Sequence, residues 1–372
     1  MTQSASAKLA SWESERAHYQ GLGPLEVLLW RTDVTDIYVN GPDEVWVDGP
    51  RGLERTEIRF SSDDEVRELA VRILAGEGRR LDASQPCGGV HTTSGYRLHA
   101  VLPPIASGHT HLSIRIQPED RPDLRDLGAA GMFGSAVESL LRKIVSAKKT
   151  FLISGSTGSG KTTLLNAMLG TCHPAERLLL IEDSSELAPR HPHAVSLRTR
   201  TSNAEGAGAV TLTDLIRESL RMGPDRIIVG ECRGPEVTDL FLAMNTGHEG
   251  GGTTIHANSA NAVPARLMAL GALAAMSPEE VARQATTAIQ VVIHLERGAT
   301  GRRVEQVGML EPTEAGMAVL PAVTVDASGD VTTTPRWPAL RRLLDSAAGS
   351  PSRRGDIPPR EANAGVFVGE GS

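Results

Sequence analysis

One stretch in the middle of the chain has the residue types and spacing of a phosphate-binding loop: GSTGSGKT, residues Gly155–Thr162. It matches the pattern G-x-x-x-x-G-K-[ST] and lies between the apolar run TFLISG and the helical pattern KTTLLNAML, as that pattern requires. Backbone N–H groups and a helix N-terminus then face the phosphates, the lysine reaches the β and γ oxygens, and the hydroxyl binds Mg²⁺. We predict that ATP and Mg²⁺ bind through Gly155, Ser156, Thr157, Gly158, Ser159, Gly160, Lys161, Thr162 and Thr163.

Acidic residues end two later apolar runs. Glu231 ends DRIIVGE, where Gly230 stands in place of a second acid, and we predict that Glu231 polarises the attacking water, directly or through the Mg²⁺ shell. The alternative is a carboxylate that only caps the helix GPEVTDLFLAMN. Glu182 and Asp183 end LLLIED. Ligands gather at the carboxyl ends of parallel strands, so these two acids are predicted to complete the Mg²⁺ shell through water, with a solvated turn as the alternative.

Two histidines, His248 and His256, flank a run of glycines in MNTGHEGGGTTIHANS. A metal site is one interpretation, but Glu249 and Cys232 supply no third ligand at a regular spacing. The pattern favours a Gly-rich loop that returns to the sheet edge of the phosphate loop, where a histidine responds to the γ-phosphate. The alternative is a structural histidine with its hydrogen bonds satisfied, which suits His256, in the strand-like TTIHAN, better than His248.

Composition limits the classes of protein that this chain can represent. Its 372 residues carry a formal net charge of -7, the pI is near 5.9, and only five of 38 basic residues are lysines. These values argue against a protein whose main task is to neutralise a nucleic-acid backbone. Three cysteines without CxxC spacing indicate neither a disulfide framework nor a zinc ribbon, and they fit a reducing cytoplasm. No apolar run approaches the roughly 20 residues of a membrane helix, so we expect any membrane association to be peripheral, through a partner.

The pattern of apolar residues divides the chain into two domains. The predicted division is a helical or flexible segment at 1–20, an α+β domain at 21–117, a linker at 118–134, an α/β domain at 135–333 and a largely disordered tail at 334–372. In the first domain, short strands broken at Gly-Pro turns surround one helix, which opens with a predicted capping box from Ser62 to Glu65. The linker is rich in proline, glycine and charge.

The second domain has a different pattern of apolar residues. A helix with a predicted capping box from Ser135 to Glu138 precedes the strand TFLISG, and apolar strands then recur at RLLLIED, RIIVGE, GTTIHA and QVVIHLE with helices between them. This alternation predicts a mainly parallel sheet with both faces covered by helices. The fold class is therefore α/β, preceded by a small α+β domain.

Taken together, these motifs make the chain similar to the type II/type IV secretion traffic ATPases, in the tight-adherence (Flp) pilus assembly and conjugal-transfer-associated branch. The resemblance covers roughly residues 20 to 310 and rests on TDIYVNGPDEVWV, GRRLD, GSTGSGKTTLLNAML, LLLIEDSSEL, LRMGPDRIIVGECRGPE and MNTGHEGGGTTIHANSANAVPARL. It implies a RecA-like P-loop NTPase domain, a hexameric ring on the cytoplasmic face of the membrane, and ATP hydrolysis that drives pilin polymerisation or export of a secreted substrate. The implied partner is an inner-membrane platform protein.

The resemblance also implies roles for individual residues. Lys161 and Thr162 bind nucleotide and Mg²⁺, Glu182 belongs to an acidic box, Glu231 is the catalytic acid, and His248 with His256 forms a histidine box. Arginines from the first domain reach the phosphates across an interface, and the two expected to do so are Arg97, in SGYRLHAV, and Arg115, in SIRI. One departure is Gly223 in LRMGPDR, where relatives usually carry an arginine.

Three other functions remain open on the sequence. A scaffold that binds ATP without productive hydrolysis would not need Glu231. A RecA-like DNA translocase for conjugation is disfavoured by the acidic balance and the scarcity of lysine. A small-molecule kinase lacks any lid or acceptor-binding pattern.

Overall fold

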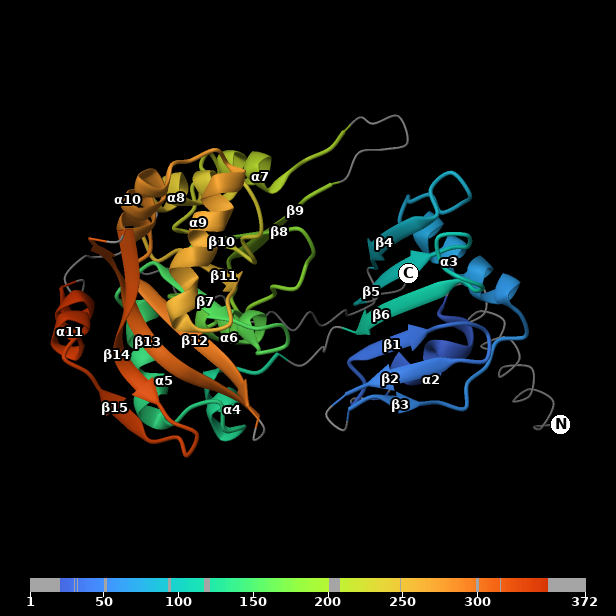
Figure 1. Ribbon diagram of the computed structural model, residues 1–372, viewed down its shortest axis with the longest axis horizontal. Coiled ribbons are helices and arrows are strands. Elements are labelled where there is room, and N and C mark those ends of the chain that lie inside the picture. Colours follow the sequence, from blue (N-terminus) through green and yellow to red (C-terminus); the bar gives the residue numbers. More distant parts are fainter. Residues whose placement is uncertain are drawn as a thin grey trace, which may run out of the picture. The chain divides into compact units, whose positions relative to one another are not determined.

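The structure, a computed structural model, describes residues 21–346 apart from 30, 32, 50, 51, 93, 94, 117–120, 201–207, 248, 299, 300 and 315. The described chain forms two compact units (Figure 1). Unit 1 runs to Arg121 and unit 2 starts at Pro122. No helix within the described ranges has the length and hydropathy needed to cross a bilayer. The predicted segment at 1–20 and the end of the chain beyond residue 346 lie outside the described residues.

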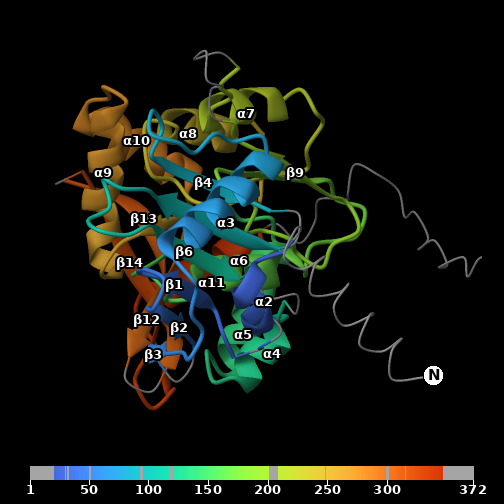
Figure 2. The same cartoon turned by 90° about the vertical axis from the view of Figure 1, so that its right-hand side faces the viewer.

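Unit 1 is built on a six-stranded antiparallel sheet with the order β3-β2-β1-β6-β5-β4. Residues on one side of its strands are buried, as Leu98 and Ala100 are in β5. The helix α3 lies over the sheet (Figure 2) and buries Val66, Leu69 and Leu74 in the same core. The elements are η1 Gly23–Leu25, α2 Glu26–Leu29, β1 Asp36–Val39, β2 Val45–Asp48, β3 Glu54–Arg55, α3 Asp63–Gly76, β4 Cys87–His91, β5 Tyr96–Val101 and β6 His111–Ile116. The predicted α+β character of this unit is confirmed.

Ser62 caps α3 as predicted. Its side chain accepts a hydrogen bond from the backbone N–H of Glu65 at 3.3 Å. The return bond of the predicted capping box is shifted by one residue, because the Glu65 carboxylate accepts from the backbone N–H of Ser61 at 2.6 Å.

Unit 2 contains a nine-stranded sheet with the order β15-β14-β13-β12-β7-β11-β10-β8-β9. Neighbours from β12 to β9 are parallel, and those from β15 to β12 are antiparallel. Every residue of β7, β8 and β10 is buried, as expected of strands covered on both faces. The strands are β7 Phe151–Gly155, β8 Leu178–Glu182, β9 Ala194–Arg198, β10 Arg226–Val229, β11 Gly252–His256, β12 Val291–Gly298, β13 Gly301–Thr313, β14 Gly316–Val325 and β15 Val331–Thr333. The mainly parallel, RecA-like sheet is confirmed.

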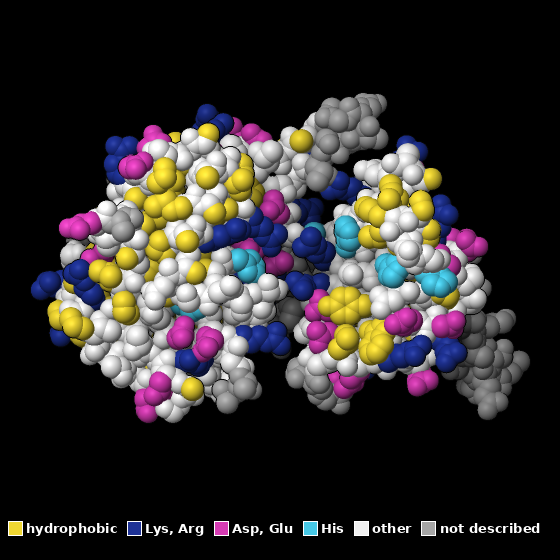
Figure 3. Space-filling view, in the orientation of Figure 1, with side chains coloured by type: hydrophobic (Ala, Val, Ile, Leu, Met, Phe, Trp, Pro, Cys, Tyr) yellow, Lys and Arg dark blue, Asp and Glu magenta, His cyan; other side chains and the backbone are white. Residues whose placement is uncertain are grey.

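Helices cover the two faces of this sheet in two groups that belong to separate hydrophobic clusters. One face carries α4 Leu124–Ala129, α5 Ser135–Ser146, α6 Lys161–Leu169 and α11 Trp337–Asp345. The other carries α7 Leu212–Ser219, α8 Val237–Asn245, α9 Val263–Leu273 and α10 Pro278–Ala288, with η2 Ala260–Ala262 before α9. On the outer side of the second group Leu242 and Leu273 are 52% and 65% exposed, and Figure 3 shows hydrophobic side chains gathered there. Unit 2 therefore presents an apolar patch to its surroundings.

Three segments of unit 2 differ from the sequence-based expectation. The stretch predicted as a linker contains α4, whose Leu124 and Leu127 are buried in the core. The stretch predicted as a disordered tail contains α11, which buries Leu340 and Leu344. The capping box predicted from Ser135 is wrong, because Gly134 is the N-cap residue of α5 and no side chain caps the helix. Short helices such as α4 and α11 gain their stability from tertiary packing more than from their intrinsic helix propensity.

Candidate nucleotide-binding site

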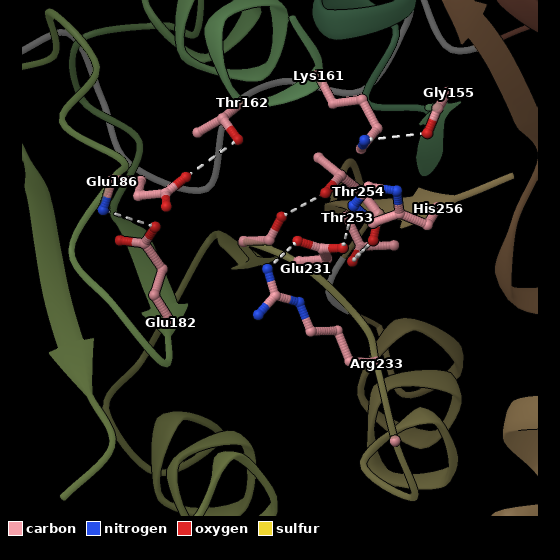
Figure 4. A network of polar contacts seen from close by, with 12 residues as sticks. Gly155, Lys161, Thr162, Glu182, Glu186, Glu231, Arg233, Thr253, Thr254 and His256 are labelled. Carbon is pink, nitrogen blue, oxygen red and sulfur yellow. Dashed lines mark hydrogen bonds and ion pairs between the residues drawn. The ribbon is translucent and has the colours of Figure 1, made fainter. Parts of the chain in front are cut away.

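The strand order of unit 2 brings four segments to one edge of the sheet. β7 ends at Gly155, where the phosphate loop begins, and it lies between β12 and β11. β11 pairs with β7 in a register that sets His256 beside Gly155. β10 and β8 follow in parallel, so Glu231 and Glu182 reach the same carboxyl edge. Figure 4 shows these side chains close to the start of α6. This is the edge at which ligands of parallel α/β sheets bind.

The phosphate loop leads directly into α6. Gly160 is the N-cap residue and has φ of 95°, a left-handed conformation that favours glycine. No side chain caps the helix, so the N–H groups of its first turn have no capping partner. Together with the partial positive charge of the helix N-terminus, they form the anion-binding arrangement that the sequence predicts.

Lys161 is held against the loop that precedes it. Its Nζ donates hydrogen bonds to the carbonyl oxygens of Gly155 at 3.0 Å and Ser156 at 2.8 Å. The residue is buried, and burial lowers the pKa of its ammonium group, while the nearby Glu231 carboxylate opposes that shift. Carbonyl oxygens are weak partners for an ammonium group compared with phosphate oxygens. The site therefore presents a partly desolvated cation at the position expected for the β and γ phosphates.

Glu231 stands between two cationic or titratable side chains. Its Oε2 accepts a hydrogen bond from Nη2 of Arg233 at 2.6 Å, and this bond raises the pKa of the guanidinium. Its Oε1 lies 3.2 Å from Nε2 of His256, yet it is buried without a hydrogen bond of acceptable geometry. A buried carboxylate oxygen of this kind is available to a water molecule or a metal shell.

The alternative role of Glu231, as a cap for the following helix, is wrong. Glu236 is the N-cap residue of α8, and its carboxylate accepts from the backbone N–H groups of Arg233 at 2.6 Å and Gly234 at 2.8 Å. The chain therefore uses a different acid for the turn before the helix. Glu231 is left facing the phosphate loop.

Two acids, Glu182 at the end of β8 and Glu186 after it, have different surroundings. Glu182 is buried, and its Oε1 accepts from the backbone N–H groups of Glu186 at 3.0 Å and Leu187 at 2.9 Å. A Cβ on Gly230 would lie 2.8 Å from Cγ of Glu182, so a glycine at that position makes room for this side chain. Glu186 instead accepts from the Thr162 hydroxyl at 3.4 Å. The acid beside Thr162 is Glu186. The sequence pattern did not single it out, because only the folding of the chain after β8 brings this side chain to the start of α6.

These residues fit a Mg²⁺ ion that accompanies a nucleotide. Mg²⁺ prefers oxygen ligands, keeps several waters and is commonly bound by one or two carboxylates plus substrate phosphates. Thr162 and Glu186 supply oxygens at the start of α6, and Glu231 has a buried oxygen without a donor. Across the described part of the chain, no group of three or more His, Cys, Asp or Glu side chains has the arrangement of a metal site.

The Gly-rich loop before β11 differs from the expectation. β11 starts at Gly252 beside Phe151, the first residue of β7, and only its end at His256 reaches the phosphate loop. The carbonyl of Gly250 accepts from Arg226, the first residue of β10. The glycines therefore lie at the amino edge of the sheet, opposite the phosphate loop, because α8 has carried the chain back across the sheet. His248 lies outside the described residues.

His256, the last residue of β11, lies beside Glu231. Burial and the nearby Lys161 lower the pKa of its imidazole, and the Glu231 carboxylate opposes that shift. The imidazole is accordingly neutral near pH 7 and can accept or donate a hydrogen bond. Its Nε2 lies 3.2 Å from the nearer Glu231 oxygen, and a role for His256 in sensing the γ-phosphate stays a prediction.

Arg97 and Arg115 are neighbours in unit 1. They are paired in register on β5 and β6, and Arg115 is exposed, with its Nε 2.9 Å from Oδ1 of Asp36. Their contact with phosphates of a neighbouring subunit stays a prediction.

Gly223 stands at a position where the backbone conformation favours glycine. Its φ is 62°, in the left-handed region, just after the turn that ends α7. The preceding carbonyl, of Met222, accepts from Nε of Arg177 at 3.1 Å. A side chain at this position would strain the turn, so the backbone conformation favours glycine here.

Comparison with known proteins agrees with this geometry. Residues 18–316 match the family described as type II/IV secretion system protein. A Mycobacterium tuberculosis H37Rv protein, whose name assigns it provisionally to conjugal transfer, is 46% identical over 347 residues, which cover 91% of this chain and 95% of that one. The type IV secretion system protein PtlH of Bordetella pertussis is 35% identical over 276 residues, 67% of this chain and 79% of PtlH.

A solved structure shares the fold. The pilus retraction motor PilT with bound ADP aligns with a TM-score of 0.53 and 18% sequence identity, over 86% of this chain and 85% of PilT. At this identity the similarity concerns the fold alone. The match to the family over most of the chain, together with the phosphate loop and its acids at one sheet edge, leads to one conclusion: this chain belongs to the type II/IV secretion system protein family.

Proposed function

We propose that this protein is a hexameric ATPase motor that hydrolyses ATP in unit 2 and powers assembly of a tight-adherence (Flp) pilus or type II/IV secretion. The observation that carries the proposal is the meeting of Lys161, Thr162, Glu231 and His256 at the carboxyl edge of one sheet. A phosphate cradle, a cation, a metal-binding hydroxyl and a carboxylate are the parts that hydrolysis of a bound triphosphate needs.

In this proposal each residue has one task. The loop amides and Lys161 stabilise negative charge on the β and γ phosphates, and Thr162 would hold Mg²⁺, which would supply further neutralisation of that charge. Glu231 orients a water molecule for attack on the γ-phosphorus, the bond to the β–γ bridging oxygen breaks, and ADP and phosphate result. Arg233 donates a hydrogen bond to the Glu231 carboxylate and so fixes its orientation. His256 contacts Glu231 and senses loss of the γ-phosphate, and His248 is assigned to the same histidine box by resemblance.

The proposed setting is the inner face of the cytoplasmic membrane, with an inner-membrane platform protein as partner and a pilin or secreted protein moved indirectly. Arg97 and Arg115 would complete the site across a subunit interface, which makes hydrolysis depend on ring closure. The exposed Leu242 and Leu273 on unit 2 support a surface that a partner covers.

The test is ATP hydrolysis and ATP binding by the purified protein and two variants. Lys161→Ala should abolish binding, whereas Glu231→Gln should bind ATP and lose at least about hundredfold in kcat. Lys143→Ala is the matched control, because this lysine pairs with Asp345 on the surface of unit 2. A Glu231→Gln protein that hydrolyses ATP at the normal rate would remove the role assigned to that acid.

A second candidate is a DNA-translocating ATPase in conjugation, which the name of the Mycobacterium tuberculosis relative favours. It predicts hydrolysis stimulated by DNA and lost at high salt. Hydrolysis that DNA does not change would favour the pilus or secretion motor. If the wild-type protein binds ATP without hydrolysing it, the ATP-gated scaffold becomes the better account.

A further inference from the structure

The hairpin formed by β12 and β13 extends past the end of the phosphate-loop strand. β12 pairs in parallel with β7 as far as Leu295, which lies beside Gly155. Three further residues of β12, ending at Gly298, continue along the phosphate loop before the chain returns as β13. In this extension Arg297 lies directly opposite Arg302.

The two sides of the hairpin differ in charge, because one carries an ion pair and the other two arginines. On one side Glu296 is paired in register with Arg303, which donates to the Glu296 carboxylate and to the carbonyl of Val325. On the other side, Arg297 and Arg302 have no hydrogen bond or ion pair with any residue that the structure describes, and both are exposed. Like charges directly opposite each other on an antiparallel pair are destabilising. Without a ligand, the repulsion between Arg297 and Arg302 therefore lowers the stability of the protein.

The unpaired side faces the phosphate loop. A Cβ built on Gly158 would lie 3.1 Å from Nη1 of Arg297, and one built on Gly160 would lie 3.5 Å from Cδ of Arg302. Both arginines thus lie against glycines of the loop that cradles phosphate, from the side opposite to Glu231 and His256, since β12 and β11 flank β7.

We propose that Arg297 and Arg302 bind the polyphosphate chain of the nucleotide held by the same subunit's phosphate loop. This inference rests on the proposed function and adds a subsite to it. A bound anion offsets the repulsion between the two guanidiniums, whose planar donor forks match phosphate oxygens. The subsite belongs to unit 2 and needs no neighbouring subunit, so it supports binding before ring closure, whereas Arg97 and Arg115 act only after it.

The test measures Kd by calorimetry for ATP, ADP and inorganic tripolyphosphate, with the full chain carrying Arg297→Gln, Arg302→Gln or both. Each single change should weaken all three ligands by roughly tenfold, and the double change more, because each removes a charge-assisted hydrogen bond. The matched control is Arg303→Gln, which removes the same charge from the other side of the hairpin and should leave Kd within about twofold. Arg297→Lys should restore part of the affinity.

Thermal unfolding separates this role from a structural one. Without ligand, the double variant should melt at the same temperature as the wild type or higher, since a repulsive pair is gone, while the rise in Tm on adding ADP should shrink. Unchanged Kd values in the double variant, an equal loss in Arg303→Gln, or a loss for ATP without one for tripolyphosphate would each overturn the subsite. Such a result in a protein that still binds ATP through Lys161 leaves the ATPase proposal standing.

Discussion

The two edges of the unit 2 sheet treat their charged groups in opposite ways. At the amino edge, Arg226 is 1% exposed and donates to Glu176 at 2.5 Å and to the carbonyls of Gly250 at 3.0 Å and Val145 at 2.8 Å. Lys148 lies 3.3 Å from the second Glu176 oxygen. At the carboxyl edge, described above, one Glu231 oxygen is buried without a donor. At the amino edge the protein itself satisfies the hydrogen bonds of the charged groups. At the carboxyl edge a ligand would complete them.

This contrast indicates which charges are structural. Burial acts to raise the pKa of Glu176, yet Arg226 and Lys148 hold it below its ordinary value, so the acid stays ionised within a closed network. Burial lowers the pKa of Lys161 without an equally close carboxylate to reverse it. Perturbed groups without a complete set of protein partners mark functional sites, whereas paired ones mark stability.

The largest expected effect is at the amino edge. Arg226→Gln should lower the free energy of unfolding by about 3–5 kcal/mol, because it leaves the Glu176 carboxylate buried without its main partner. Urea unfolding monitored by circular dichroism measures it. Glu231→Gln, at the other edge, should change the same quantity by less than about 1 kcal/mol. Similar losses for the two variants would mean that the edges do not differ as the contacts indicate.

The two histidines of the glycine-rich stretch sharpen the comparison. His256→Asn should reduce kcat for ATP by about hundredfold, because this side chain contacts Glu231. His248→Asn should reduce it less, since the neighbouring glycines lie at the amino edge. Steady-state ATPase assays at saturating ATP give both values. A greater loss for His248 than for His256 would contradict this expectation.

Variants of Glu182, at the end of β8, and of Glu186, after it, should differ in the Mg²⁺ concentration that hydrolysis needs. Glu186→Gln should raise the Mg²⁺ concentration needed for half-maximal hydrolysis by roughly tenfold, because this carboxylate adjoins the Thr162 hydroxyl. Glu182→Gln should change that concentration less and affect stability more, since its oxygen holds two backbone N–H groups. Mg²⁺ titrations at fixed ATP test the difference, and equal shifts would contradict it.

The smallest expected effect is a pH dependence of stability from His294, which is 2% exposed on β12. Its Nδ1 lies 2.9 Å from Oγ of Ser154, and Nε2 lies 3.7 Å from a Glu305 oxygen. Burial lowers its pKa, so the unfolded state binds more protons below the ordinary value of 6.5. Stability contributed by the neutral imidazole is therefore present above pH 6.5 and is lost as pH falls below it.

His294→Gln should accordingly flatten part of the decline in unfolding free energy as pH falls from 7 to more acid conditions. His256 and His191 also have lowered pKa values and account for a remaining slope. Denaturant unfolding at a series of pH values measures both curves. Identical slopes in the variant and the wild type would assign the pH dependence to other groups.

Much of the candidate site was predictable because its signals are local. The phosphate loop needs a strand, glycines and a helix within one short stretch, and Lys161 and Thr162 follow from that pattern. Glu231 ends an apolar strand, which a parallel sheet sends to the same edge. The position of the glycines before β11 was predicted wrongly, because a nine-residue helix, α8, determines to which edge the chain returns.

By itself, the sequence determined the fold class, the buried strands of the parallel sheet and the phosphate-loop motif between a strand and a helix, since these depend on period and spacing. Only the tertiary structure decided that Glu186 adjoins Thr162, that Arg226 closes the opposite edge, and that α4 and α11 pack on the core. It also set Arg297 and Arg302 against the phosphate loop. The physical reason is that these contacts join residues distant in sequence, and strand order, which local patterns do not specify, determines which side chains meet.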